Sequence, residues 1–420
     1  MNVGIIGSGG RENSICFSLK KSKRVDKIFC MPGNAGTANI SKNLEIDINN
    51  FQQVKDAVNK YKIDLLVVGP EKPLVDGIVD FFNNTDVKVF GPNKKASQLE
   101  GSKIFTKKLC QKYNIPTAKF GIFQNAIESK KFIDNSSFPI VIKADGLASG
   151  KGVYISENTE KAYQAIDEIF NGKFGEAKNI LIEEFLTGEE MSYFIVTDGS
   201  SIKPFETAQD HKRVYEGDKG ENTGGMGAYS PSRLINNNLE AKIIDKIINP
   251  TLSGLKDSGI EYRGFLYAGL MIQNNEPFLI EYNVRMGDPE CQTILPKLNT
   301  DLMEILISCC DGKLNETNIK WDKRKSLSIV LCSKGYPGQY KKNLIIDNIK
   351  NIKTDQNNLC FHAGTILKDD KILSVGGRVL NFVAVAKDFS EARNNIIKNI
   401  DILNWSDGFY RRDIGYKVIE

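Results

Sequence analysis

The chain has 420 residues, of which 41% are hydrophobic and 26% charged, and its formal net charge of +4 comes without a basic tract. This length suffices for two to four domains with sizeable cores, while the balanced charge argues against nucleic acid and membranes as the main partners. Because no apolar run approaches the roughly 18 residues of a membrane span and no signal-peptide pattern is present, we expect a cytoplasmic protein.

The first hundred residues alternate short apolar runs with helical patterns. The predicted strands are residues 3–6, 27–30, 65–68 and 87–90, and the predicted helices are residues 51–61 and 74–83. This alternation is typical of a doubly wound parallel sheet. The loop at residues 69–73 follows the third strand, so we expect it to line the crevice at the carboxyl ends of the strands.

The loop after the first strand is rich in glycine. Gly7, Gly9 and Gly10 are similar to a dinucleotide fingerprint, but Glu12 stands where the third glycine belongs, and no acid ends the second strand. A loop of this kind at a helix N-terminus suits an anion such as a sugar phosphate. A tight turn without a ligand explains the pattern equally well.

A lysine at the end of an apolar strand precedes a second glycine-rich loop. Residues 139–142 predict a buried strand that ends at Lys143, and Gly150, Lys151 and Gly152 follow. A buried ammonium needs an anionic partner, and glycines let backbone N–H groups approach a ligand. The pattern indicates a polyphosphate site, although the spacing does not match a Walker A loop. The alternative is a glycine-rich hairpin with solvated lysines.

Residues 179–196 predict two strands joined by an acidic hinge. The hinge region contains Glu183, Glu184, Phe185 and Glu190. Backbone groups in such a hinge can bind an adenine edge, and a carboxylate can accept from ribose hydroxyls. An ordinary acidic hairpin is the alternative.

Residues 207–231 predict a long polar loop with little periodicity. Loops of this length inside a compact protein are more often functional than idle. His211, Lys212 and Arg213 could stabilise phosphate or carboxylate charge there, and a solvated basic turn is the alternative.

The segment 277–290 predicts a strand that carries a metal site. Glu281 and Asn283 are two residues apart, so on a strand they point to the same face. Two oxygen ligands with room for water and phosphate are typical of magnesium. Arg285 would continue that face and offer a partner for an anion. An exposed polar face on an edge strand is the alternative.

The remaining residues, from about 326, predict a small α+β domain. Residues 327–332 have the pattern of a strand, and residues 390–403 have that of an amphipathic helix after an Asp-Phe-Ser start.

Taken together, the loop at 143–153, the hinge at 183–190 and the strand at 281–283 resemble those of ATP-grasp enzymes. Within that superfamily the chain is similar from end to end to the glycinamide ribonucleotide synthetases (phosphoribosylamine–glycine ligases). The stretches that carry the resemblance are residues 7–12, 209–213, 222–231, 264–270 and 285–290. Asn13 departs from the histidine expected there, and Met286 stands where an aromatic residue is usual.

The resemblance implies an α/β ATP-grasp fold in three parts. These are an N-terminal doubly wound parallel-sheet domain at residues 1–102, an ATP-grasp domain at 103–325 and a small C-terminal α+β domain at 326–420. Residues 120–190 would form a mobile lid over ATP. The second metal-binding acid of many ATP-grasp enzymes would fall near Met271, so the ligands of a second metal are left open.

The reaction implied by the resemblance joins 5-phosphoribosylamine to glycine in the second step of purine synthesis, while ATP becomes ADP and phosphate. ATP first converts glycine to glycyl phosphate, and the sugar amine then attacks the carbonyl. No side-chain nucleophile is required, so catalysis consists of charge neutralisation and alignment. A chain with only two histidines agrees with this chemistry.

The resemblance also implies a set of site residues. The ATP contacts are Lys103, Lys143, Gly150, Lys151, Gly152, Glu183, Glu184, Phe185 and Glu190. The ligands for Mg²⁺, with Mn²⁺ as a possible substitute, are Glu281 and Asn283. The sugar substrate meets Gly9, Gly10, Arg11 and Gly287. The catalytic residues are Arg285, Asp210, Lys212 and Asp288, of which Asp210 and Asp288 are the candidates for a general base.

Two other functions were weighed against this one. The ATP-grasp enzyme that carboxylates aminoimidazole ribonucleotide is disfavoured by the stretches 209–213 and 222–231, and a nicotinamide-dependent dehydrogenase is disfavoured by the broken fingerprint at 7–12. We expect a monomer that acts on ATP, glycine and 5-phosphoribosylamine and has no nucleic-acid or membrane partner.

Overall fold

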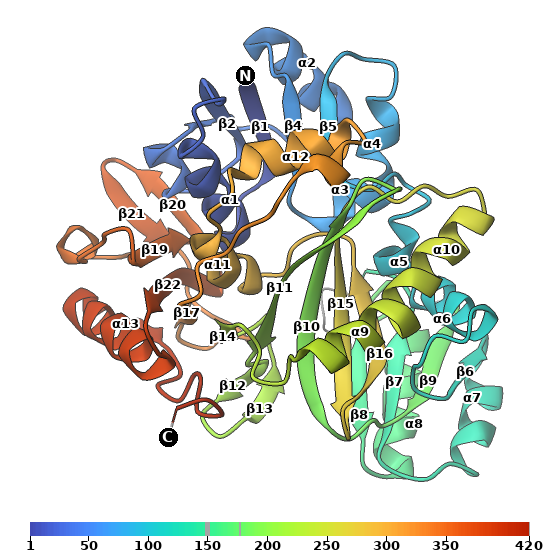
Figure 1. Ribbon diagram of the computed structural model, residues 1–420. Coiled ribbons are helices and arrows are strands. Elements are labelled where there is room, and N and C mark those ends of the chain that lie inside the picture. Colours follow the sequence, from blue (N-terminus) through green and yellow to red (C-terminus); the bar gives the residue numbers. More distant parts are fainter. Residues whose placement is uncertain (148–151, 176–177, 420) are drawn as a thin grey trace.

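The computed structural model describes residues 1–147, 152–175 and 178–419. Its N-terminal part, at the top of Figure 1, is a five-stranded parallel sheet in the order β3-β2-β1-β4-β5. The strands are β1 (Asn2–Gly7), β2 (Lys27–Pro32), β3 (Lys42–Asn43), β4 (Leu65–Val68) and β5 (Lys88–Phe90). The helices are α1 (Gly10–Lys20), α2 (Phe51–Tyr61), α3 (Glu71–Asp76) and α4 (Ile78–Phe81). The predicted doubly wound sheet is confirmed.

One helix of this domain differs from the prediction. Residues 74–83 do not form a single helix, because α3 ends at Asp76 and the next residue, Gly77, has a φ of 100°. A glycine takes this left-handed conformation without a steric penalty, so it ends one helix and starts the next.

Both faces of the N-terminal sheet are covered, as parallel sheets require. Ile6 and Val68 point to the face covered by α2 and α3. Ile5 and Val67 point to the opposite face, where they pack with α1 and with α12 (Leu302–Cys310). The loop after β1 and the start of α1 therefore lie at the sheet edge that faces the rest of the molecule.

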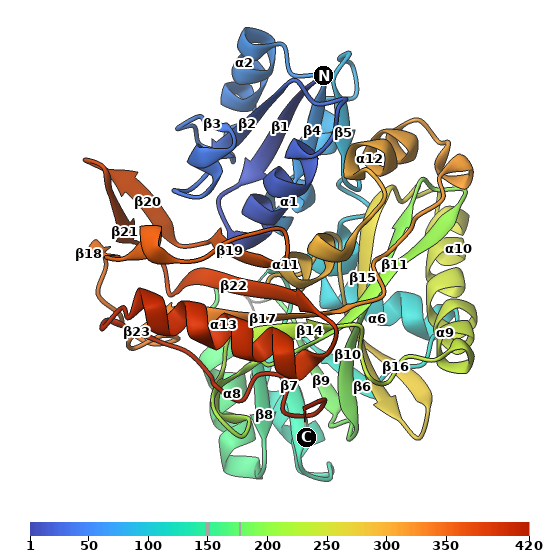
Figure 2. The ribbon, with the colours of Figure 1, turned by 60° about the vertical axis from the view of Figure 1, so that its left-hand side comes forward.

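The lid region is a separate four-stranded antiparallel sheet in the order β6-β9-β7-β8, and it lies at the bottom of Figures 1 and 2. Its elements are β6 (Phe120–Phe123), α7 (Ala126–Ile133), β7 (Ile140–Ala144), β8 (Val153–Ser156), α8 (Thr159–Phe170) and β9 (Ile180–Glu184). Alternation along β7 buries Ile140 and Ile142 against the helices and points Val141 to the other face.

A nine-stranded sheet connects the ATP-grasp region to the C-terminal region. Its order is β16-β15-β10-β11-β14-β17-β22-β19, and β23 pairs with β17. The strands are β10 (Glu189–Thr197), β11 (Ile202–Asp210), β14 (Gly227–Ser230), β15 (Gly264–Gln273), β16 (Glu276–Asn283), β17 (Lys325–Ser333), β19 (Asn358–His362), β22 (Arg378–Ala386) and β23 (Gly408–Phe409). The pairing of β14 with β17 is the point where the two regions become one sheet.

Helices from several regions of the chain pack around this sheet. They are α5 (Gln98–Gly101), α6 (Lys103–Lys112), α9 (Asn237–Ile243), α10 (Asn249–Asp257), α11 (Glu290–Ile294) and α13 (Phe389–Leu403). A small sheet in the order β18-β21-β20 comprises β18 (Leu344–Ile345), β20 (Thr365–Lys368) and β21 (Lys371–Ser374). The predicted helix at 390–403 is confirmed, and the Asp388 side chain caps it by accepting from the Glu391 N–H at 2.8 Å.

The polar stretch 207–231 is more regular than the sequence predicts. Strand β11 extends to Asp210, and the hairpin strands β12 (Arg213–Tyr215) and β13 (Lys219–Asn222) precede β14. The hairpin is short and mostly exposed, so it lacks the apolar alternation that would have marked it as strand.

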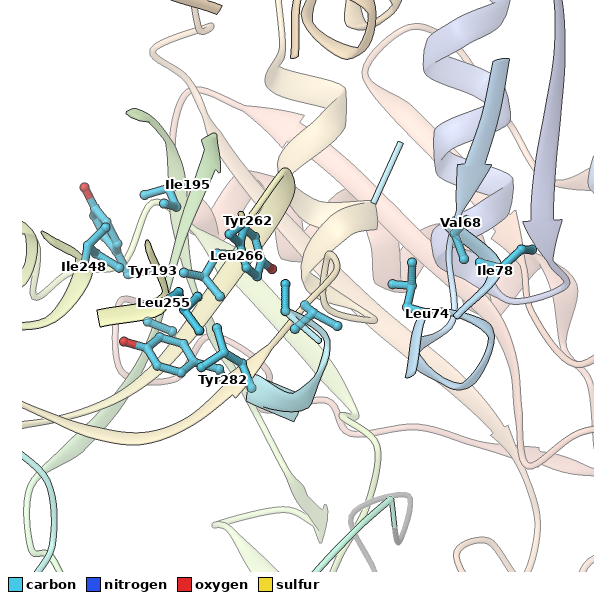
Figure 3. Packing of buried hydrophobic residues seen from close by; sticks show 14 of the residues in the cluster. Val68, Leu74, Ile78, Tyr193, Ile195, Ile248, Leu255, Tyr262, Leu266 and Tyr282 are labelled. Carbon is cyan, nitrogen blue, oxygen red and sulfur yellow. The ribbon is translucent and has the colours of Figure 1, made fainter. Parts of the chain in front are cut away.

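A large hydrophobic cluster joins the N-terminal sheet to the nine-stranded sheet. Figure 3 shows Val68, Leu74 and Ile78 from the N-terminal domain on one side and residues such as Leu266 and Tyr282 on the other, all in the same cluster. Across the described residues, no helix has both the length and the apolar character needed to cross a bilayer.

Candidate active site

A cavity of about 1110 Å³ lies where the N-terminal sheet, the lid and the nine-stranded sheet meet. Every predicted site residue that the structure describes lines it, except Gly10. Gly150 and Lys151 lie outside the described residues. Pro70 and Glu71 also line the cavity, which confirms the prediction for the loop after β4.

A buried triad of charges forms the lid wall of the cavity. The Lys143 ammonium lies 2.8 Å from one carboxylate oxygen of Glu183, and the Lys107 ammonium lies 3.2 Å from the other. Burial alone would raise the pKa of Glu183, but the charges of Lys143 and Lys107 outweigh it and hold that pKa below its usual value. With two ammonium groups around one carboxylate, the triad carries a net positive charge that faces the cavity.

The hinge between β9 and β10 lies beside this triad. Glu184 accepts from the Lys119 N–H at 2.9 Å, and Phe185 is exposed along the cavity wall. The Glu190 carboxylate contacts the Lys212 ammonium, and mainly for this reason the pKa of Glu190 is lowered. The Glu183 side chain, by contrast, is occupied by its two lysines, so a contact with adenosine would have to use its backbone.

A third lysine faces the candidate metal ligands. Lys103, at the start of α6, donates to the Gly146 carbonyl at 2.9 Å. Burial lowers the pKa of Lys103, and the nearby Glu281 carboxylate opposes that shift. The Lys103 ammonium therefore lies near both the Gly146 carbonyl and Glu281, and Lys143 is close enough for its charge to act on Lys103.

Glu281 and Asn283 share one face of β16, as predicted. A bulge between Glu281 and Leu279 shifts the register with β15, after which Glu281 pairs with Gly269 and Asn283 with Tyr267. Tyr282 between them is buried in the core cluster. One carboxylate and one amide oxygen on the cavity wall fit Mg²⁺, which is usually held by few protein ligands together with phosphate and water.

The position near which a second metal-binding acid is expected holds a methionine. Met271 lines the cavity on β15, and among the described residues no group of three His, Cys, Asp or Glu side chains has the arrangement of a metal centre.

Arg285 is held by two carboxylates of the N-terminal half. Its guanidinium lies 2.6 Å from Glu100 and 3.3 Å from Glu71. Burial raises the pKa of Glu100 to about 7, and the charge of Arg285 opposes this shift. The predicted anion partner is therefore already neutralised in this state, and it would bind substrate only as part of this cluster.

Asp210 is the last residue of β11, and Lys212 follows it in the next loop. Both residues line the cavity. Burial raises the pKa of Asp210 to about 7, against the charge of Lys212 and together with those of Glu290 and Glu190. A carboxyl that titrates near neutral pH is suited to accept a proton from an amine.

Glu290 is a further carboxylate at this wall, and the sequence analysis did not assign it a role. It is 4% exposed, lines the cavity, and receives a 3.4 Å hydrogen bond from the Ser192 hydroxyl. No Lys or Arg nitrogen in the described residues lies within 4.0 Å of it. A buried carboxylate without a matching cation is costly, and together with Asp210 it makes this wall attractive to a positively charged group.

The glycine-rich loop after β1 is capped from within the protein. Glu12 accepts from the Gly9 N–H at 2.6 Å, and Asp288 accepts from the Arg11 N–H at 3.1 Å. These N–H groups were predicted to face an anion, and carboxylates of the protein occupy two of them. A Cβ on Gly10 would lie 2.4 Å from Asn381 in β22, so Gly10 serves close packing between domains.

Asp288 joins three parts of the site. It accepts from Gln292 at 2.7 Å and lies 3.3 Å from Arg378 of β22. Burial raises the pKa of Asp288, but the charges of Arg378 and Arg11 outweigh it, so the net shift is downward. A carboxylate held ionised in this way is a weaker base than Asp210, and Arg378 is a cation of the cavity that the sequence analysis did not assign.

The residues missed by sequence reasoning share a cause. Glu100, Glu290, Lys107 and Arg378 acquire their importance from partners far along the chain, such as the pairing of Glu100 with Arg285. Of these four residues, only Arg378 has a local signal in the sequence. It begins a strand directly after two glycines.

Comparison with known families matches most of the chain. The models for the phosphoribosylglycinamide synthetase N domain, ATP-grasp (A) domain and C domain match residues 1–100, 101–291 and 326–417. The curated phosphoribosylamine–glycine ligases of Brucella melitensis and Mesorhizobium japonicum are 42% and 44% identical to it, over 100% of this chain and 99% of each relative.

Solved structures agree in fold. A crystal structure of the phosphoribosylamine–glycine ligase from Thermotoga maritima superposes with a TM-score of 0.86 at 32% identity, covering 99% of this chain and 100% of that one. The biotin carboxylase domain of the Hydrogenobacter thermophilus 2-oxoglutarate carboxylase has a TM-score of 0.73 at 14% identity, with 95% of this chain and 89% of that one covered. The second likeness concerns the fold alone.

Proposed function

The chain belongs to the phosphoribosylglycinamide synthetase family, and we propose that it joins glycine to 5-phosphoribosylamine with ATP, giving glycinamide ribonucleotide, ADP and phosphate in purine biosynthesis. The observation that carries this proposal is the end-to-end match to relatives named for that ligation. The cavity shared by the three regions is large enough for a nucleotide and two small substrates.

ATP would lie between the lid and β16. The ammonium groups of Lys143 and Lys103 support this placement, because buried cations on the cavity wall attract phosphate oxygens. We propose that Glu184, Phe185 and Glu190 enclose the adenosine, with Glu183 contributing through its backbone and holding the two lysines with its carboxylate. Gly150, Lys151 and Gly152 belong to the same proposed phosphate site.

Glu281 and Asn283 would hold Mg²⁺, or Mn²⁺ in its place. When bound, the ion would offset the charge of the phosphates during transfer. Lys103, near Glu281, and Lys143, which pairs with Glu183, would keep the phosphate chain in line with the glycine carboxylate.

The wall formed by Asp210 and Glu290 would bind the amines. The glycine ammonium offsets the two carboxylates while its own carboxylate faces the ATP, so transfer of the phosphoryl group gives glycyl phosphate. The phosphoribosylamine nitrogen then attacks the carbonyl, Asp210 takes its proton, and phosphate leaves. Lys212, next to Asp210, would stabilise charge on the carbonyl oxygen.

The sugar phosphate would bind near the loop after β1, at Gly9, Arg11 and Gly287, whereas Gly10 packs against Asn381 and does not line the cavity. Because carboxylates occupy the Gly9 and Arg11 amides, the cations Arg11 and Arg378 are better placed to supply the charge. Asp288 would then act by orienting Arg378 and Arg285 by holding Glu100 and Glu71 in the cavity wall.

The decisive experiment is a coupled assay of ADP release by the purified chain. We expect release that requires glycine, increases with phosphoribosylamine and yields one glycinamide ribonucleotide per ADP. ADP release that is independent of glycine, or a product without the glycyl group, would overturn the assignment.

We further propose domain limits of 1–102, 103–325 and 326–420, and a cytoplasmic monomer, for which light scattering provides the test of mass.

A further inference from the structure

A short segment near the C-terminus, residues 411–417, packs against the loop that carries Lys212. We call these residues the latch segment. They belong to the C-terminal region, whereas the loop leaves β11 in the ATP-grasp region. The contacts between the two are made by buried groups that the proposed reaction does not use.

Arg411 provides the first anchor. Its guanidinium is 1% exposed and donates to the Arg213 carbonyl at 2.9 Å and to Asp218 at 2.8 Å. Asp413 accepts from the same guanidinium at 2.8 and 2.7 Å and from the Gly217 N–H at 2.9 Å. Two carboxylates thus match the buried cation and leave it fixed in a single orientation.

His211 provides the second anchor. The Gly415 N–H donates to His211 Nε2 at 3.2 Å, so the neutral imidazole carries its proton on Nδ1. Burial, with the charge of Arg411, lowers the pKa of His211 to about 4. The ring therefore stays neutral near pH 7 and keeps its acceptor for the latch segment.

The two anchors flank one residue. Lys212 lies between His211 and Arg213, its carbonyl accepts from the Thr223 N–H at 2.8 Å, and its ammonium contacts Glu190. The imidazole before Lys212 and the carbonyl after it are therefore both bonded to the latch segment, while the Lys212 side chain lines the cavity. A displacement of either anchor would move the ammonium relative to the reacting groups.

We propose that the latch segment is the positioning element of the catalytic loop, with Arg411 and the Gly415 N–H aiming the Lys212 ammonium from outside the cavity. This inference rests on the role proposed above for Lys212. Arg411 and His211 are positioning residues, since they act through Lys212.

The test compares substitutions that keep or remove each anchor. We expect Arg411→Met to lower kcat by roughly 100-fold, the order expected for a misplacement of about 1 Å. Arg412→Met should leave kcat unchanged, because the exposed Arg412 side chain contacts Asp401 and the Tyr410 ring and not the loop that carries Lys212, as far as the described residues show. His211→Gln keeps an oxygen within reach of the Gly415 N–H and His211→Asn is too short, so the Gln variant should have at least about tenfold the kcat of the Asn variant.

A double-mutant cycle separates positioning from general stability. In a Lys212→Met background, Arg411→Met should lower kcat by less than about threefold, because the residue through which it acts is gone. An equal loss in both backgrounds, or equal kcat for the two folded His211 variants, would overturn the proposal. Should Arg411→Met fail to fold, the His211 pair decides the question. Wild-type kcat in Lys212→Met alone would instead refute the proposed role of Lys212.

Discussion

Lys143 and Glu183 form a buried ion pair of 2.8 Å across two neighbouring strands of the lid. Lys107 approaches the same carboxylate from α6, outside the lid sheet. The carboxylate thus joins the lid to the body of the enzyme, and in the proposed function it keeps two cations in place for the phosphates of ATP.

Glu183→Gln should destabilise the protein by about 3 kcal/mol, because it leaves two buried ammonium groups with a neutral partner. The folded pKa of Glu183 is depressed, so its stabilisation is present above the unfolded pKa and is lost as pH falls through the folded pKa. Urea unfolding should therefore show a gap between wild type and variant that is full at pH 7 and narrows in acid. A gap that widens in acid would contradict this account.

Glu281→Gln and Asn283→Ala should each lower kcat by at least about 100-fold with the fold intact. Each removes a proposed ligand of the Mg²⁺ that would compensate the charge of the transferring phosphate. Titration of activity with Mg²⁺ should show a raised requirement for the ion. Glu276→Gln is the matched control, since Glu276 lies on the same strand but pairs with the exposed Lys246 at 2.7 Å. Unchanged Mg²⁺ dependence in the Glu281 and Asn283 variants would refute the metal assignment.

Gly10→Val should destabilise the junction between domains by about 1–3 kcal/mol through overpacking. The added Cβ would meet Asn381 at 2.4 Å and Gln292 at 2.5 Å. Thermal unfolding measures the loss, and Asn381→Ala in the same chain should recover part of it by making room. If Gly10→Val instead kept full stability and raised only the KM for the sugar amine, the glycine would be a substrate contact.

Asp210→Asn should change the pH dependence of stability. Because the folded pKa of Asp210 is raised to about 7, its contribution is fully present below the unfolded pKa and is lost as pH rises through about 7. The ligand-free wild type should therefore lose stability between pH 5 and 8, in calorimetry or urea unfolding, more than the Asn variant does. Asp288→Asn is the opposing control, since the pKa of Asp288 is lowered. A steeper decline in Asp210→Asn would contradict the sign.

Much of the fold follows from local pattern in the sequence. The period of two along β7 separates buried Ile140 and Ile142 from Val141 and Lys143 on the cavity side, and the same period places Glu281 and Asn283 together. Strand ends and glycines thus predict where the site lies.

The tertiary contacts of the site residues could not be predicted from local sequence pattern. Arg285 was predicted to meet substrate and is held by Glu100 and Glu71, which come from a different domain. In the sequence, Glu12 is a departure from the dinucleotide-binding fingerprint. In the structure, its carboxylate accepts a hydrogen bond from the Gly9 N–H. Such contacts depend on tertiary packing between segments far apart in the chain, which no local period encodes.

The pairing of β14 with β17 has a consequence for how the chain reaches this structure. Ala228 pairs with Ser328, so the edge of the ATP-grasp strands stays open during synthesis until about a hundred further residues have left the ribosome. An open strand edge is prone to pair with other chains. We therefore expect the N-terminal parallel sheet to form early, the central strands to wait for β17 and β22, and chaperone demand to peak in that interval.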